Sequence, residues 1–211
     1  MLKYRPFEMH CHTRHSDGTF LVPQLIESVA AYGYAGLALT DHNAVTGLLE
    51  VTEELQRKNN CLVLPGIEWT TFYGHLLVIG CDRFVDWRFV TPDTIDEALQ
   101  EIRAAGGIAG VAHPCEVGSP LMCGCNWEFR VKRWDLMDYV EIWSGPDPHA
   151  SAKNGLAMPW YDALLNQGYH LAISAGRDWH GPDKPGQIPL LTATYPVSYT
   201  HLRAHETTLH L

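Results

Sequence analysis

The sequence predicts an α/β fold built on a parallel sheet, and two observations support this. Strand-like apolar runs alternate with helix-like amphipathic segments along most of the chain, a pattern typical of parallel sheets. Histidine and acidic residues recur where the strand-like runs end, and in a parallel barrel those ends meet on one face. A length of 211 residues with 46% hydrophobic residues suits one globular domain.

The predicted elements follow from periodicity and from turn residues. We expect strands over 8–13, 36–41, 62–71, 75–80, 107–112, 139–143, 170–175 and 190–194. We expect helices over 23–32, 46–57, 94–105 and 160–166. Thr94 and Glu97 have the spacing of a capping box at a helix start. Gly33, Gly106 and Gly168 stand where left-handed residues end helices.

Composition and charge narrow the classes of function. The formal net charge is −9 and no basic block is present, so we expect no nucleic-acid polymer as a partner. No apolar run approaches the roughly 20 residues needed to span a bilayer, and residues 1–8 lack the apolar core of a signal peptide. We therefore expect a cytoplasmic protein without a membrane partner, whose six cysteines are reduced thiols.

A metal site is the chemistry that the polar residues favour. Side chains alternate across a strand, so His10 and His12 face one side and Cys11 faces the other. One His-x-His pair is weak evidence for a metal site, but metal-binding residue types recur at the ends of further strand-like runs. These residues are Asp41, His42, Glu68, His75, His113, Asp178 and His180. Asp41 is either a partner that orients an imidazole or a cap at the strand end.

Six short motifs in this chain resemble the PHP (polymerase and histidinol phosphatase) superfamily. They are His10-Cys11-His12, Ser16-Asp17-Gly18, Leu39-Thr40-Asp41-His42, Gly66-Ile67-Glu68, Ala112-His113-Pro114 and Asp178-Trp179-His180. The resemblance covers about residues 8–195. Within the superfamily, Gly74-His75, the run from Val140 to Pro146 and Asp178-Trp179-His180-Gly181 resemble the CehA/McbA subgroup.

The resemblance implies a distorted seven-stranded TIM-like (β/α) barrel that holds two or three divalent ions. It implies one ion at His10, His12, Glu68 and Asp178, and a second at Glu68, His75 and His113. It implies a third ion at Asp17, His42 and His180. Mixed imidazole and carboxylate ligands suit zinc, manganese or iron better than magnesium.

The expected activity is metal-dependent hydrolysis of a small phosphate ester or nucleotide by a metal-bridging hydroxide. Asp17, His180 and Glu68 are the candidate catalytic residues, and Arg14 and Arg177 are candidate contacts for a substrate anion. One alternative is a carboxyl or carbamate ester hydrolase of the CehA/McbA type, because the same hydroxide attacks a carbonyl carbon. A second alternative is a metal-binding barrel without turnover.

The segment 196–211 breaks the pattern of the preceding chain. It resembles translated sequencing-adapter read-through. We therefore assign residues 1–195 to the PHP metallohydrolase domain and expect the tail to have no part in the fold. On this interpretation the barrel lacks its C-terminal closing element, and His201, His205 and His210 have no role. The alternative is that His201 and His205, four residues apart, share a helix face and bind a metal.

Overall fold

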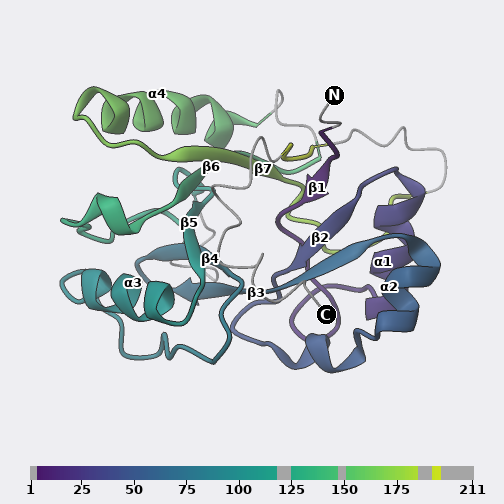
Figure 1. The fold of residues 1–211 in the computed structure, drawn as a ribbon. Coiled ribbons are helices and arrows are strands. Elements are labelled where there is room, and N and C mark those ends of the chain that lie inside the picture. Colours follow the sequence, from purple (N-terminus) through teal and green to yellow (C-terminus); the bar gives the residue numbers. More distant parts are fainter. Residues whose placement is uncertain (1–3, 118–124, 147–150, 185–191, 196–211) are drawn as a thin grey trace.

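Seven strands lie side by side in sequence order and curve into a nearly closed barrel in this computed structural model (Figure 1). The structure describes residues 4–117, 125–146, 151–184 and 192–195. The strands are β1 Phe7–Glu8, β2 Gly36–Leu39, β3 Leu62–Thr71, β4 Gly74–Ile79, β5 Ile108–Ala112, β6 Tyr139–Ser144 and β7 Ala172–Gly176. The distorted α/β barrel predicted from the sequence is confirmed.

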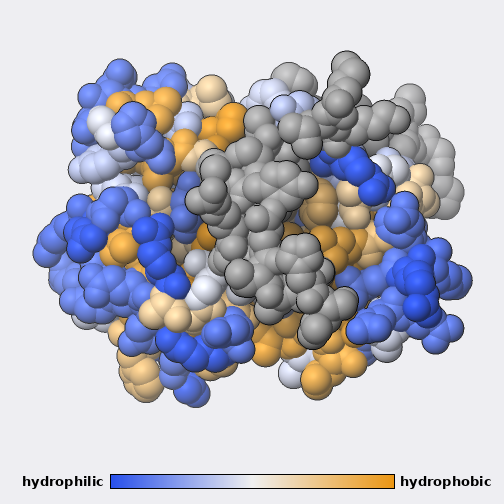
Figure 2. Space-filling view, viewed as in Figure 1, coloured by the Kyte–Doolittle hydropathy of each residue, from blue (hydrophilic) through white to orange (hydrophobic). Residues whose placement is uncertain are grey.

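Helices connect the strands and cover the outside of the barrel. They are α1 Val22–Ala31, α2 Glu53–Asn59, α3 Ile95–Ala104 and α4 Ala152–Asn166, with short 3₁₀ turns η1 Thr46–Glu50 and η2 Trp134–Leu136. The inner faces of α1 and α3 bury apolar side chains, and hydrophilic residues cover the flanks where α2 and α3 lie (Figure 2). No helix in the described ranges has the length and apolar character needed to cross a membrane.

The expectation of a fully parallel sheet is wrong at β4, which runs antiparallel to both β3 and β5. The two-residue turn 72–73 between β3 and β4 is too short for a parallel crossover, so the chain must reverse there. Gly74 has φ +128°, a conformation that glycine adopts readily. The remaining strand pairs are parallel, as the alternation predicted.

Several helix boundaries also differ from the prediction. The helix expected over 46–57 is divided into η1 and α2, because the Thr52 side chain accepts a hydrogen bond from Leu55 N and starts a new helix. The capping box at Thr94 does not form, since its hydroxyl oxygen accepts from Thr91 N instead. α4 begins well before 160. The positive φ angles expected at Gly33, Gly106 and Gly168 are confirmed.

Isolated bridges connect the N-terminal part of the chain with the segments that follow β7. The strand expected over 8–13 ends at Glu8, and Cys11 then pairs with Trp179 in a single bridge. Phe7 pairs with Thr194, which lies in the strand expected over 190–194. Residues 190, 191 and 196–211, with the predicted tail and its histidines, lie outside the described residues.

The barrel interior places a bulky side chain over a glycine. Tyr139 of β6 lies opposite Gly110 of β5, and its ring crosses that glycine so that the hydroxyl donates to Leu77 O of β4 at 3.1 Å. A Cβ at position 110 would overlap the Tyr139 ring. The absence of a side chain at this position therefore allows three neighbouring strands to share one core.

We expect Gly110→Ala to lower the free energy of unfolding by about 1–3 kcal/mol, because the Tyr139 ring has to move. Urea unfolding followed by circular dichroism measures the change. Gly155→Ala is the control, since the exposed helical Gly155 has open space around it and should gain up to about 1 kcal/mol. Equal stability of Gly110→Ala and the native chain would contradict the packing described.

Candidate metal centre

The predicted metal-binding side chains converge at one edge of the barrel. Glu68 near the end of β3 forms a bridge with His42, which follows β2, and His113 directly follows β5. His75 stands at the start of β4 rather than at a strand end. Because β4 is antiparallel, its start lies beside the end of β5, and His75 is paired in register with Ala112.

Pairing between the two ends of the barrel completes this edge. His12 N donates to Trp179 O at 2.9 Å, and Trp179 N donates to His10 O at 3.1 Å. These hydrogen bonds place His10 and His12 beside Asp178. Cys11 points away, and its thiol donates to Ala38 O, so the alternation predicted for residues 10–12 is confirmed.

The carboxylate of Glu68 occupies the middle of the cluster and is fully buried. Imidazole nitrogens surround both of its oxygens at hydrogen-bond distance. Oε2 lies 3.0 Å from His10 Nε2, 3.3 Å from His12 Nε2 and 2.9 Å from His42 Nδ1. Oε1 lies 2.9 Å from His75 Nδ1 and 3.1 Å from His113 Nε2.

Asp178 adds a second carboxylate next to the two N-terminal histidines. Its Oδ1 lies 3.1 Å from His12 Nε2 and 3.3 Å from His10 Nε2. Asp178 has φ +50° and His113 has φ +25°, backbone conformations that residues other than glycine rarely adopt. Backbone strain of this kind is common at functional sites, where the surrounding structure holds it.

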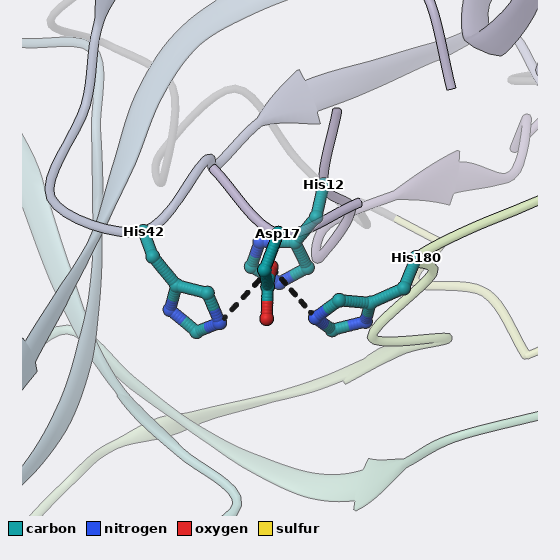
Figure 3. A group of neighbouring side chains, drawn as sticks. All are labelled: His12, Asp17, His42 and His180. Atoms are coloured by element: carbon teal, nitrogen blue, oxygen red, sulfur yellow. Dashed lines mark ion pairs between the residues drawn. The ribbon is translucent and has the colours of Figure 1, made fainter. Parts of the chain in front are cut away.

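A more exposed group lies at the mouth of the cluster (Figure 3). Asp17 Oδ1 lies 3.2 Å from His180 Nε2 and 3.7 Å from His42 Nε2. His12 lies behind this carboxylate and stacks on both histidine rings, with centroid distances of 4.3 and 4.1 Å. The Asp17 side chain is 53% exposed, so this end of the cluster is open to solvent.

The donor set fits divalent ions. Two ligand atoms bound about 2.1 Å from one ion, at angles between 90° and 109°, are roughly 3.0–3.4 Å apart, which is the spacing found here. In the described part of the chain, His10 Nε2, His75 Nε2 and Glu68 Oε2 are buried without a hydrogen bond of good geometry, although His10 Nε2 and Glu68 Oε2 are close. Such buried polar atoms are costly unless a charged partner satisfies them.

Burial and mutual charge shift the titration of these groups. Burial alone lowers the pKa of His10, but Glu68, Glu141 and Asp178 raise it well above its ordinary value. Burial alone raises the pKa of Glu68, but His10, His113 and His42 hold it well below the usual range. Burial lowers the pKa of His12. The buried carboxylates therefore favour positive charge at this position, and a bound cation would compete with protons for the imidazole nitrogens.

Three acidic residues at this edge were not predicted as site residues. Glu141 of β6 is fully buried and accepts from His10 Nδ1 at 3.0 Å and from His113 N at 3.1 Å. Glu8 is also fully buried, and burial raises its pKa to about 8. Glu116 lies 3.4 Å from His113 Nδ1. The sequence feature that could have identified Glu8 and Glu141 is an acidic residue between apolar residues of a strand-like run.

Arg177 is not positioned as the predicted substrate contact. Its guanidinium is 2% exposed, forms an ion pair with Asp183 and stacks 4.0 Å from the centroid of the Trp179 ring. Tyr32 also donates to Asp183, at 2.6 Å. Because this guanidinium is buried and paired with Asp183, it connects Asp183 to the ring of Trp179, next to His180, and is not exposed to a ligand.

Two further candidates near the cluster have local partners. Arg14 is exposed, and its Nε donates to Thr19 O at 3.1 Å on the loop that carries Asp17. Asp41 accepts from Thr13 N and from Ser16 Oγ, so it orders that loop as a cap at the strand end and not as a histidine partner. A substrate contact by Arg14 stays a prediction.

We expect Glu141→Gln to weaken metal binding by about 10–100-fold, because the charged acceptor that orients His10 is lost. Competition with a chromophoric chelator measures the affinity. Glu101→Gln on the exposed face of α3 is the matched control and should leave the affinity unchanged. Unchanged affinity in Glu141→Gln would show that this carboxylate does not support the cluster.

We expect Arg177→Met to lower the free energy of unfolding by about 3–5 kcal/mol, because it removes the charged partner of Asp183, whose side chain is only 13% exposed. Thermal and urea unfolding measure this loss. Arg88→Met removes an exposed ion pair with Asp86 and should change stability little. Native stability of Arg177→Met, together with weaker binding of inorganic phosphate, would restore the substrate-contact interpretation.

Comparison with known proteins agrees with the motifs and the fold. The family model of the PHP domain matches residues 8–110, just under half of the chain. A 3',5'-nucleoside bisphosphate phosphatase from Chromobacterium violaceum is 34% identical over 79 residues, which are 36% of this chain and 27% of that protein. The chain therefore spans about a quarter of the length of this curated relative.

Solved structures show the same fold at low sequence identity. A two-domain protein from Bacteroides vulgatus, described as containing a predicted PHP-like metal-dependent phosphoesterase, matches with a TM-score of 0.63 at 18% identity, over 85% of this chain and 53% of that chain. An inferred metal-dependent phosphoesterase from Bifidobacterium adolescentis matches with a TM-score of 0.60 at 17% identity, over 89% and 92%. The chain is thus similar to PHP-domain proteins in sequence over residues 8–110 and in fold over most of its length.

Proposed function

We propose that this chain is a metal-dependent phosphoesterase acting on a small phosphate ester or nucleotide. The observation that carries the proposal is the buried Glu68 carboxylate with five imidazole nitrogens within 3.3 Å of its oxygens. The match to the PHP domain and the partial similarity to a nucleoside bisphosphate phosphatase support the choice of phosphate as the reacting group.

The proposed ligands form three sets that share Glu68 or adjoin one another. His10, His12, Glu68 and Asp178 would hold one ion, and Glu68, His75 and His113 a second. Asp17, His42 and His180 would hold a third at the open mouth. Histidine with carboxylate favours zinc, manganese or iron over magnesium.

Divalent ions bound in these sets would activate a water molecule and neutralise the charge that develops on a phosphate. The protein fixes the geometry of the ligands. Glu141 orients the His10 ring, and the Arg177–Asp183 pair holds the loop on which Asp178 and His180 lie. Asp17 and His180, 3.2 Å apart at the exposed mouth, are the side chains that we propose as proton donors to a departing alcohol or nucleoside, with a metal-bound water as the alternative.

A hydrolase for carboxyl or carbamate esters, as in the CehA/McbA subgroup, is a second candidate function. The position of Arg177 favours it, because one of the two predicted cationic contacts for a phosphate is occupied by Asp183. Two tryptophans next to proposed ligands in the sequence, Trp69 and Trp179, are almost fully buried and offer no apolar surface to an ester. Trp69 is buried in the core beside β4, and Trp179 packs between Phe20 and Arg177. Phosphate therefore remains the better choice.

We expect the chain supplied with zinc or manganese to hydrolyse nitrophenyl phosphate or bis(nitrophenyl) phosphate, and to lose this activity with EDTA. His12→Ala and Glu68→Ala should each reduce the rate at least about a hundredfold, because each removes proposed metal ligands. Release of nitrophenol measures the rate, and metal content is measured in parallel.

His170→Ala is the control, since this histidine is exposed outside the cluster and its loss should not change the rate. Hydrolysis of naphthyl acetate without either phosphate ester would support the ester hydrolase instead. Metal binding without turnover of any of the three substrates would support a non-catalytic barrel.

A further inference from the structure

A lysine and a glutamate adjoin the metal cluster on the side formed by β5 and α4. Lys153 Nζ donates to Glu116 Oε2 at 2.7 Å, and the same oxygen lies 3.4 Å from His113 Nδ1. The other ring nitrogen of His113 lies 3.1 Å from Glu68 Oε1. Ligand atoms of His113, Glu116 and Asp178 all lie within 4.8 Å of one another, so Glu116 borders directly on the proposed ion sites.

The surrounding structure holds this pair in place. Asn154 bonds with its side chain to both Ser144 N and Ser144 O at 3.0 Å, which fastens the first turn of α4 to the end of β6. The Lys153 side chain is only 19% exposed. His113 Nδ1 is buried and, within the described residues, makes no hydrogen bond of good geometry, although it faces Glu116.

The charge of Lys153 is unusual for its place in the helix. The amino end of a helix carries partial positive charge, so a lysine in the first turn of α4 opposes it. Residues that break such local rules are expected at functional sites. A negatively charged ligand that interacts with both Lys153 and the ions would compensate for this placement.

We propose that Lys153 binds the phosphate group of the substrate and that Glu116 positions both Lys153 and His113. The proposal rests on the function proposed above and specifies the substrate as a phosphomonoester. A lysine ammonium has three N–H donors, of which one bonds to Glu116, so two can bond to phosphate oxygens. Lys153 thereby takes the role that the sequence had suggested for Arg177.

The charge of the ligand explains the choice of a monoester. A phosphomonoester carries up to two negative charges, a diester carries one and a carboxyl ester carries none on the reacting group. A fixed ammonium beside the ions stabilises the most highly charged ligand most. Loss of Lys153 should therefore weaken monoester binding more than diester binding.

The test uses inorganic phosphate as the probe, so that binding is measured without turnover. Isothermal titration of phosphate into the zinc- or manganese-loaded chain compares the native protein with Lys153→Met. We expect the dissociation constant to rise about 10–100-fold while metal content and melting temperature stay unchanged. Lys153→Arg should recover part of the affinity.

Kinetics supply the second readout. In Lys153→Met the KM for nitrophenyl phosphate should rise by a similar factor with kcat little changed, and the KM for bis(nitrophenyl) phosphate should rise less. Lys58→Met is the matched control, because Lys58 forms an exposed pair with Glu27. Its phosphate affinity should equal that of the native chain.

The possible outcomes separate this inference from the proposed function. Unchanged phosphate affinity in Lys153→Met, or loss of bound metal from that variant, would overturn the role of Lys153 as a phosphate contact. Native phosphate binding that depends on Lys153, in a chain that hydrolyses neither phosphate ester, would support the contact and reject the proposed phosphoesterase.

Discussion

The burial of one carboxylate, Glu68, within a cage of histidines is the constraint on which the rest of this structure depends. A charge with no exposed surface is stable only if cations or donors surround it, and here the donors come from segments spread along the chain from His10 to His113. The strand order, the reversal at β4 and the pairing across the barrel opening all bring those segments to the same edge. The contacts that form the barrel therefore also bring the residues of the cluster together.

The polar groups at this edge form layers with different degrees of exposure. Glu8 and Glu141 lie fully buried behind the histidines, Glu68 and Asp178 lie among them, and Asp17 opens to solvent. The innermost acids fix backbone and ring positions through hydrogen bonds, as Glu141 does for His10. The surroundings also separate the acidities of these carboxyl groups, since the pKa of Glu8 is raised by burial and that of Glu68 is lowered by the histidines around it.

Two basic residues near the cluster form ion pairs in different surroundings. Arg177 forms a buried ion pair with Asp183 and stacks on Trp179, which stabilises the loop bearing His180. Lys153 forms its ion pair with Glu116, a residue that borders the cluster itself. An arginine side chain that is 2% exposed is out of reach of a ligand, whereas Lys153 is 19% exposed and one of its three donors bonds to Glu116 in the described structure. The partner of each cation decides its role.

The sequence by itself determined the α/β class, most strand positions and most of the residues that cluster, because periodicity and residue type are local properties. It also determined that His10 and His12 share a face. Only the tertiary structure decided that β4 is reversed, so that His75 reaches the cluster from the start of a strand. Only the tertiary structure showed that Arg177 is paired with Asp183 and that Glu116 and Lys153 border the site. Ion-pair partners are chosen by distances between remote segments, and those distances exist only once the barrel has formed.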